Sequence, residues 1–599
     1  MSDAPEQNWH GDHNNQYVRK MLNRLQQHQR VSIAARVAQR SMSTFSLQPE
    51  PVPEESAGFV QVIVYPQNPF VGEAQVRRMS RRDIQSGLMN SRLRVQDSRG
   101  IHIMPDDDGN YLYLPGDPRF DAVNAFYYAT YTLRMFERYA YRAIPWAFNA
   151  PRIMIDPHAG DQANAFYNEQ AQLLGFHTFT VKGIEHSTAA SADIVSHEAG
   201  HAVLDGLRYL YNETFSLGGR AFHESFGDMA AVLVALHDES LVHQVVTLAE
   251  GNLRGTNFIS EIAEYLIKTL KDDDYFDEHT IYLRNAVNTL TNRPFDDLDF
   301  IAANPGEELS RQEHNYSRLF TGAFYDILTG IYEHFREHTP MPDIVALHQA
   351  RDAAGRLLVC AIELGPAGEL SFADMARAFL TADVVKYEGV HTDLIKTVFA
   401  NRQILTVEAA DAHLASLENL PAIQLPDVIN TSLAATQFLE DVLVQALDLP
   451  DDHGLTPLSV YRNAIGQVYM SYFQTETVQF DGEGFESVDK PSLDIFGGLT
   501  LMFDHNTQLR SVVYRPINDE DRRQLQVIIA DLIRFRLITP ELLAPQQISR
   551  PFPKGLHLSA DETPVPEGAK LVRYPVMFDN VPDDVQNLGE HLQNWEPGN

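Results

Sequence analysis

The sequence predicts an α+β fold built from several units, and three observations lead to this prediction. The chain has 599 residues, whereas one domain usually has roughly 100–200. Residues 59–66 read FVQVIVYP, an alternating pattern typical of a strand. Several later segments repeat apolar residues at spacings of three and four, as helices do. Hydrophobic residues make up 44% of the chain and charged residues 21%, which is typical of globular proteins.

The N-terminal part is expected to contain two regions. Residues 1–57 are rich in Gln, Arg and His and end in the Pro- and Glu-rich stretch QPEPVPEES, which predicts a polar arm and linker. Residues 58–120 contain the alternating run and the later segment YLYLPGDPRF. We therefore expect a small β-containing region there.

Residues 121–405 read as strands followed by a long series of helices. The clearest helical segments are DIVSHEAGHAVLDGL at residues 193–207, AFHESFGDMAAVLVAL at 221–236 and RLFTGAFYDILTGIYEHF at 318–335. Strands that precede a helical second half predict an α+β unit.

Residues 406–599 are expected to form a C-terminal α+β accessory region. Helical patterns cover residues 432–447 and 519–536. Between them, GGLTLMFDHNTQLRSVVY reads as a β-hairpin that turns at His505 and Asn506.

The composition excludes several classes of function. A formal net charge of −34 argues against nucleic acid as a partner, because phosphate binding depends on Lys and Arg. Cys360 is the only cysteine, so disulfides within the chain and cysteine-rich zinc modules are excluded. The sequence shows neither a signal peptide nor an apolar run of about 18 residues. We expect no membrane partner and a cytoplasmic location, with export without a leader as the alternative.

A metal site is predicted within the helical pattern at residues 193–207. His197, Glu198 and His201 form the sequence H-E-x-x-H. Residues four apart on a helix share a face, so both imidazoles can bind one zinc ion, and Glu198 can act as a general base beside them. Glu224 and Asp228 are also four apart on a second predicted helix. One of these carboxylates can bind the metal while the other supports a histidine ligand.

These residues resemble the motifs of the thermolysin-like gluzincin zinc metallopeptidases. Asn164 and Ala165 lie in the segment NAFY, which is similar to the family's substrate-binding edge strand. His314 begins HNYS, similar to the motif with the family's oxyanion-stabilising histidine, and Arg284 in LRN resembles the arginine that binds substrate carbonyl groups. The resemblance implies that Glu224 is the third zinc ligand and that Asp228 is the carboxylate that supports a histidine ligand.

The resemblance covers residues 121–405 and implies a two-lobed zincin core with extra N- and C-terminal regions. This core has a β-rich lobe, a central zinc-bearing helix and a helical lobe. The family's oxyanion tyrosine has no match in register, so we expect Tyr211 to serve, with Tyr209 as the alternative. The carboxylate that orients His314 is expected to be Glu308 or Glu313.

The sequence departs from the family's motifs at two further places, one next to the predicted third ligand and the other at the family's double calcium site. His223 and Gly227 stand where the family has Asn and Ser. Asp193 matches an acidic residue of the family's double calcium site, but the position of its partner is Ala235. We therefore expect zinc as the cofactor and no double calcium site, with calcium bound elsewhere as a further possibility.

The resulting expectation is a zinc-dependent endopeptidase that acts on a peptide or protein substrate. Two alternatives have different consequences. The first is an inactive zinc-binding scaffold, and the second is a toxin or maturation protease with one partner substrate. The sequence does not indicate an oligomeric state.

Overall fold

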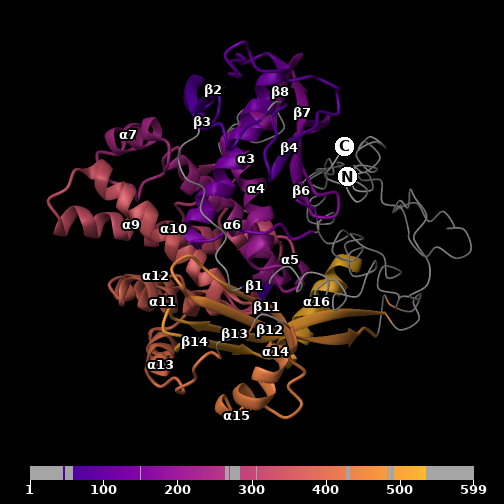
Figure 1. Cartoon of the computed structure of the whole chain (residues 1–599), viewed down its shortest axis with the longest axis vertical. Coiled ribbons are helices and arrows are strands. Elements are labelled where there is room, and N and C mark those ends of the chain that lie inside the picture. Colours follow the sequence, from indigo (N-terminus) through magenta and orange to yellow (C-terminus); the bar gives the residue numbers. More distant parts are fainter. Residues whose placement is uncertain are drawn as a thin grey trace, which may run out of the picture.

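The computed structural model describes residues 45–46 and 58–534, except for 86, 149, 264–268, 270–283, 305, 427–428, 430–431, 482–484 and 486–490. The predicted arm and linker at residues 1–57 lie outside the described residues apart from 45–46, as does the end of the accessory region after residue 534. The molecule is α+β, as predicted, with two main sheets and a central group of helices (Figure 1).

The predicted strand at residues 59–66 is present and begins the first β-hairpin. Strand β2 (Phe59–Val64) pairs antiparallel with β3 (Gln75–Ser80). Alternate residues of β2, namely Val60, Val62 and Val64, are buried. These side chains belong to the same apolar core as those of helix α3 (Pro118–Ala140), so residues 58–120 pack on the rest of the molecule and share its core.

The first main sheet has the strand order β4-β5-β7-β6, with β8 paired to β7. Its strands are β4 (Leu93–Val95), β5 (Ile153–Gly160), β6 (Ala165–Asn168), β7 (Leu173–Val181) and β8 (Ile184–Ser187). Strands β4, β5 and β7 are parallel, and β6 is antiparallel to β7. In the described part of the chain β6 pairs only with β7, so it forms an edge of this sheet.

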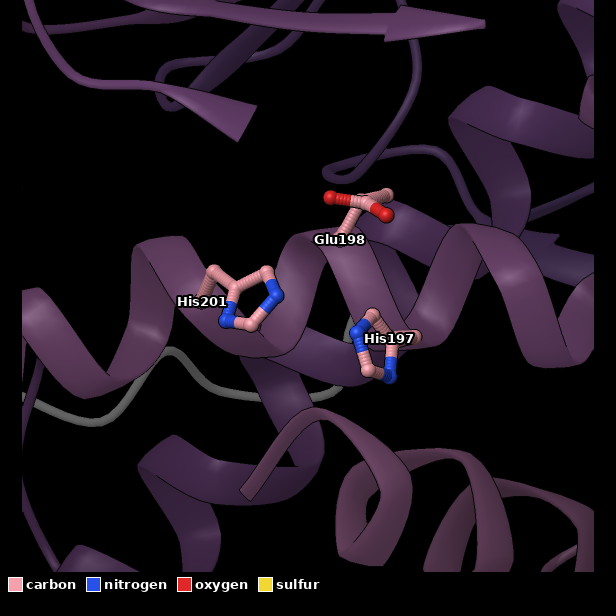
Figure 2. Close-up of side chains that lie close together, drawn as sticks. All are labelled: His197, Glu198 and His201. Atoms are coloured by element: carbon pink, nitrogen blue, oxygen red, sulfur yellow. The ribbon is translucent and has the colours of Figure 1, made fainter. Parts of the chain in front are cut away.

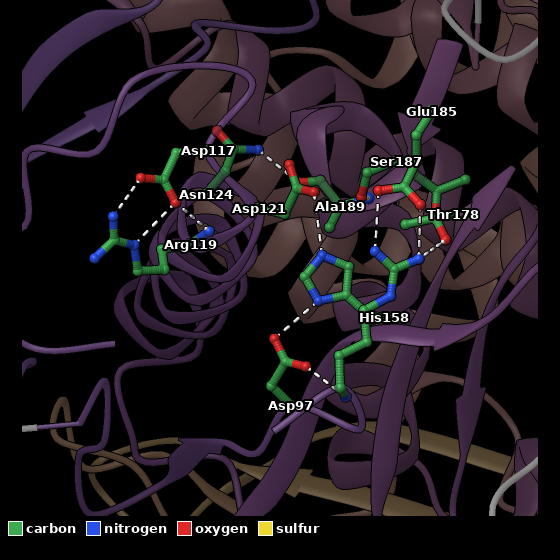
Figure 3. A network of polar contacts seen from close by, with 12 residues as sticks. Asp97, Asp117, Arg119, Asp121, Asn124, His158, Thr178, Glu185, Ser187 and Ala189 are labelled. Atoms are coloured by element: carbon green, nitrogen blue, oxygen red, sulfur yellow. Dashed lines mark hydrogen bonds and ion pairs between the residues drawn. The ribbon is translucent and has the colours of Figure 1, made fainter. Parts of the chain in front are cut away.

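A buried histidine fastens this sheet to helix α3 (Figure 3). His158 of β5 contacts Asp97 through Nδ1 at 2.8 Å and Asp121 of α3 through Nε2 at 3.3 Å. Burial alone would lower the pKa of His158, but its hydrogen bonds to Asp121 and Asp97 outweigh burial and raise the pKa to about 9. The charged imidazole therefore links three segments of the chain at neutral pH.

The helical part packs around α4 and α6. The helices are α4 (Ala192–Leu207), α5 (Leu210–Glu213), α6 (Leu217–Ala235), α7 (Glu239–Leu248), α9 (Glu313–His338), α10 (Asp343–Leu364), α11 (Phe372–Tyr387), α12 (Thr392–Asn401) and α13 (Val407–Glu418); the short strands β9 (Glu261–Ile262) and β10 (Arg284–Asn285) pair beside them. A Cβ at Gly200 of α4 would lie 3.0 Å from the Ala230 Cβ and 3.3 Å from the Gly227 Cα of α6. Glycine therefore permits the close approach of the two helices.

The second main sheet has the order β1-β11-β12-β13-β14 and includes the predicted hairpin. Its strands are β1 (Phe45–Ser46), β11 (Thr456–Arg462), β12 (Val468–Gln479), β13 (Ser492–Phe503) and β14 (Leu509–Arg515); the helices of this region are α14 (Ser432–Phe438), α15 (Val444–Ala446) and α16 (Asp519–Arg534). One face packs against α14 and the turns that follow it, through residues such as Met470 and Leu501. Figure 1 shows the sheet between these turns and the helices above it.

The other face of the second sheet packs against the end of α4. Arg208, which caps α4, is buried and donates from Nε to the Ile362 carbonyl at 2.8 Å and from Nη1 to the Ser471 hydroxyl at 2.7 Å. It also donates to the carbonyls of Glu363 and Gly365. Ser471 of β12 is paired with Thr500 of β13, so Arg208 reaches the middle of the sheet.

No single described helix is both long and apolar enough to cross a membrane. Helices α6 and α7 pass that test only as a pair, and they meet at 92°.

Candidate metal centre

Helix α4 brings together the three residues of the H-E-x-x-H sequence. Potential ligand atoms of His197, Glu198 and His201 all lie within 4.8 Å of one another, and among the described residues this is the one such group. Figure 2 shows the two imidazoles one turn apart on the same side of α4, with the Glu198 carboxylate next to them. Both histidines are buried, whereas Glu198 is half-buried.

Helix α6 places the predicted third ligand against both histidines. The Glu224 carboxylate lies 3.5 Å from the His197 Nε2 through Oε2 and 3.7 Å from the His201 Nε2 through Oε1. Two atoms bound to one zinc ion at about 2.0–2.1 Å lie roughly 3–3.5 Å apart. The three side chains therefore have the chemistry and nearly the spacing of a two-histidine, one-carboxylate zinc site.

Asp228 supports His197 from behind, as predicted by its position on α6. Its Oδ1 lies 3.0 Å from the His197 Nδ1, so Nε2 is left to face Glu224. Arg284 of β10 donates to both Asp228 oxygens, from Nε at 2.9 Å to Oδ2 and from Nη2 at 2.7 Å to Oδ1. Burial alone would raise the pKa of Asp228, but Arg284 and His197 outweigh burial and lower it. Asp228 is therefore an ionised acceptor.

The carboxylates of Asp228 and Glu224 also change the pKa of His197. Burial alone would lower this pKa, but Asp228 and Glu224 outweigh burial and raise it to about 9. Gly227 leaves the space for this ring, because a Cβ there would lie 2.6 Å from the His197 Nδ1. Glycine at position 227, where the thermolysin-like motif has serine, thus has a steric reason in this structure.

His201 has a different support, which the sequence analysis did not predict. Its Nδ1 lies 2.7 Å from the Nδ1 of His223, and the Nε2 of His223 lies 2.7 Å from Oδ1 of Asp205. His223 precedes Glu224 on α6, and Asp205 follows His201 by one turn of α4. Two features of the sequence could have indicated this contact. One is the histidine at position 223, where the thermolysin-like motif has asparagine, and the other is an acidic residue four positions after His201.

His314 lies at the mouth of the same group. It is near the start of α9, and its Nε2 is 3.3 Å from Oε2 of Glu224. Its side chain is 27% exposed, compared with 9% for His197, so solvent can reach it. The two carboxylates proposed to orient His314 have other partners: Glu313 is buried against Arg220, and Glu308 accepts from the Asn304 N–H.

The structure does not bring Tyr211 into the centre, contrary to the expectation for an oxyanion tyrosine. The Tyr211 side chain is fully buried, and its hydroxyl donates to the Met375 sulfur of α11 at 3.8 Å. Its ring lies edge-on to Phe222 at 6.1 Å between centroids. The short helix α5 directs this residue into the core. The alternative, Tyr209, is also buried and donates to Glu213 at 3.0 Å.

Two of the three predicted substrate-binding residues, Asn164 and Ala165, lie at the edge of the first sheet. The third, Arg284, lies in β10, where it is buried and pairs with Asp228. The Asn164 carbonyl accepts from the His177 N–H at 3.1 Å, and Ala165 begins strand β6. Strand β6 lies against α4. Because hydrogen-bonded and non-hydrogen-bonded pairs alternate in an antiparallel ladder, the backbone groups of Ala165, opposite Phe176, point away from β7.

Asp193, the candidate calcium residue, has a structural role. Its carboxylate accepts from the Ser191 hydroxyl and, at 2.9 Å, from the Ala263 N–H. Burial raises the pKa of Asp193. Ala235, at the position of the missing acidic partner, is buried in α6.

Comparison with known proteins adds no relative: no protein-family model matches the sequence, and no curated protein matches it. Membership of the thermolysin-like family is therefore a proposal, which depends on the motifs and the geometry described above.

Proposed function

We propose that this protein is a zinc-dependent endopeptidase with a thermolysin-like two-lobed core. The observation that carries the proposal is the convergence of the His197 and His201 Nε2 atoms on Glu224, with Glu198 beside them. His197, His201 and Glu224 would hold the zinc ion. When bound, zinc supplies a Lewis acid that polarises a carbonyl and lowers the pKa of water towards about 7.

The residues around this site have separate tasks in peptide hydrolysis. Glu198 takes a proton from the attacking water and passes it to the leaving amine nitrogen. His314, the most exposed of the three histidines, donates to the oxygen on which negative charge develops. Asp228, itself held by Arg284, fixes the orientation of the His197 ring.

An extended peptide is the substrate that the surroundings favour. Strand β6 is an edge strand beside α4, and the outward backbone groups of Ala165 can pair with a peptide added as a further strand. This arrangement favours peptide hydrolysis over a purely scaffolding role.

The decisive variant is Glu198→Gln, which removes the general base and keeps the size of the side chain. We expect zinc content to be unchanged and hydrolysis of casein or a fluorogenic peptide library to fall by about 10²–10⁴ or more. Glu418→Gln, at an exposed position at the end of α13, is the matched control. Turnover retained by Glu198→Gln would contradict the mechanism.

A chelator test distinguishes a general endopeptidase from the two alternatives. If the wild-type protein binds zinc but cleaves neither casein nor the library, the scaffold or single-substrate protease is favoured. Cleavage that stops on chelation and returns with zinc supports a general endopeptidase.

A further inference from the structure

A fully buried chain of polar side chains lies behind His201. The rings of His201 and His223 have centroids 4.7 Å apart, whereas their Nδ1 atoms are only 2.7 Å apart. The rings are 26° from parallel, and their closest polar contact is between these two nitrogen atoms. The chain ends at Asp205, and the side chains of His223 and Asp205 are both 0% exposed.

If His201 binds a metal ion, the positions of the protons on His201 and His223 follow. The Nε2 of His201 faces Glu224, so metal binding requires a free lone pair on Nε2 and the proton on Nδ1. The Nδ1 of His223 must then accept that proton's hydrogen bond. The remaining proton of a neutral His223 is on Nε2, where it donates to Asp205. One tautomer of each ring satisfies both contacts.

This support differs from that of the other histidine ligand. His197 donates directly to the carboxylate of Asp228, which is held by Arg284. At His201 an imidazole lies between the ligand and the carboxylate. The chain leaves α4 at His201, crosses to α6 at His223 and returns to α4 at Asp205, so it also ties the two metal-bearing helices together.

We propose that His223 and Asp205 are positioning residues that select the metal-binding tautomer of His201 and hold its ring in place. This inference rests on the zinc site of the proposed function. Asp205 accepts from His223 Nε2–H, which leaves His223 Nδ1 as an acceptor only. His201 then has one orientation in which Nδ1–H is paired and Nε2 points at Glu224.

The sharpest test is Asp205→Asn, which keeps the shape of the side chain but adds an N–H donor. The amide can donate to the His223 Nε2 and so shift the His223 proton to Nδ1, where it opposes the proton of His201. We expect the dissociation constant for Zn²⁺, measured by competition with a chromophoric chelator, to rise about 10–100-fold. The visible spectrum of the Co²⁺-substituted protein should also change.

A second pair of variants separates this effect from general destabilisation. His223→Phe removes the acceptor and should weaken Zn²⁺ binding at least as much as Asp205→Asn. His237→Phe replaces a half-buried histidine, just after α6, whose Nδ1 bonds to the Leu233 carbonyl. It should leave the Zn²⁺ dissociation constant within about twofold of the wild type. Thermal unfolding of each metal-free variant reports whether it is folded.

The outcomes separate this inference from the proposed function. A Zn²⁺ dissociation constant of Asp205→Asn within about twofold of the wild type would overturn the positioning role, even if the wild type hydrolyses peptides. If Asp205→Asn weakens Zn²⁺ binding as expected but the wild type cleaves no peptide, the proposed function alone is overturned.

Discussion

The two main sheets of this protein meet helix α4 in different ways. The first sheet presents the edge strand β6 to α4, next to the histidine pair. The second sheet is covered on both faces and meets the far end of α4 through Arg208. Under the proposed function, this difference is a division of labour: the first sheet offers backbone groups to the substrate, and the second supports helix α4.

The support role predicts a large loss of stability on removal of the Arg208 side chain. Arg208→Met leaves several buried carbonyl groups and the Ser471 hydroxyl without their donor. We expect the free energy of unfolding to fall by about 3–5 kcal/mol, measured by urea denaturation. Arg510→Met is the matched control, because Arg510 of β14 is 58% exposed and pairs with Asp504 at the surface; its expected effect is below about 1 kcal/mol.

The result for Arg208→Met also decides what the C-terminal region does. If that variant is as stable as the wild type, the sheet is an attached docking module, and removal of residues 407–599 should leave general cleavage intact. A destabilised variant identifies the sheet as part of the framework that holds α4.

A smaller effect is expected from the histidine that fastens the first sheet to α3. The pKa of His158 is raised from 6.5 to about 9, so the folded state binds its proton more tightly than the unfolded state. The resulting stabilisation is complete below pH 6.5 and is lost as pH rises through about 9. Its size is up to about 3 kcal/mol.

Urea unfolding at several pH values from 6 to 10 checks this prediction. His158→Gln cannot carry the charge, so the difference in stability between wild type and variant should shrink as pH rises. A difference that is constant across this range would contradict the charged state of His158.

A substitution in the edge strand β6 is expected to have the smallest effect on stability. It should instead weaken the binding of peptide substrates. Ala165→Pro removes an N–H that points away from β7, and proline is tolerated at the first residue of an edge strand. We expect unfolding free energy to change by less than about 1 kcal/mol and KM for peptides to rise about tenfold. Unchanged zinc content is the control, and an unchanged KM would remove β6 from the substrate site.

The sequence could predict those parts of the site in which two residues lie one turn apart on the same helix. Helical periodicity placed His197 with His201 and Glu224 with Asp228, because spacing of four fixes a shared face whatever lies around the helix. The α+β class followed from the same local patterns. Tyr211 was misplaced because the direction of a side chain on the short helix α5 depends on which core surrounds it.

The remaining parts depend on contacts between residues far apart in the chain. Arg208 and Ser471 are 263 positions apart, and no local pattern marks either as a partner of the other. The chain from His201 through His223 to Asp205 depends on how closely α4 approaches α6. That approach is set by Gly200 and Gly227 together, and its effect on ring positions appears only in three dimensions.

Strand β6 has a consequence for the behaviour of the protein at high concentration. A sheet edge that can accept a peptide can also accept the exposed strand of another chain, which is a common start of aggregation. With only four residues, Ala165–Asn168, the strand offers few hydrogen bonds for such pairing. Its short length therefore limits self-association through this edge.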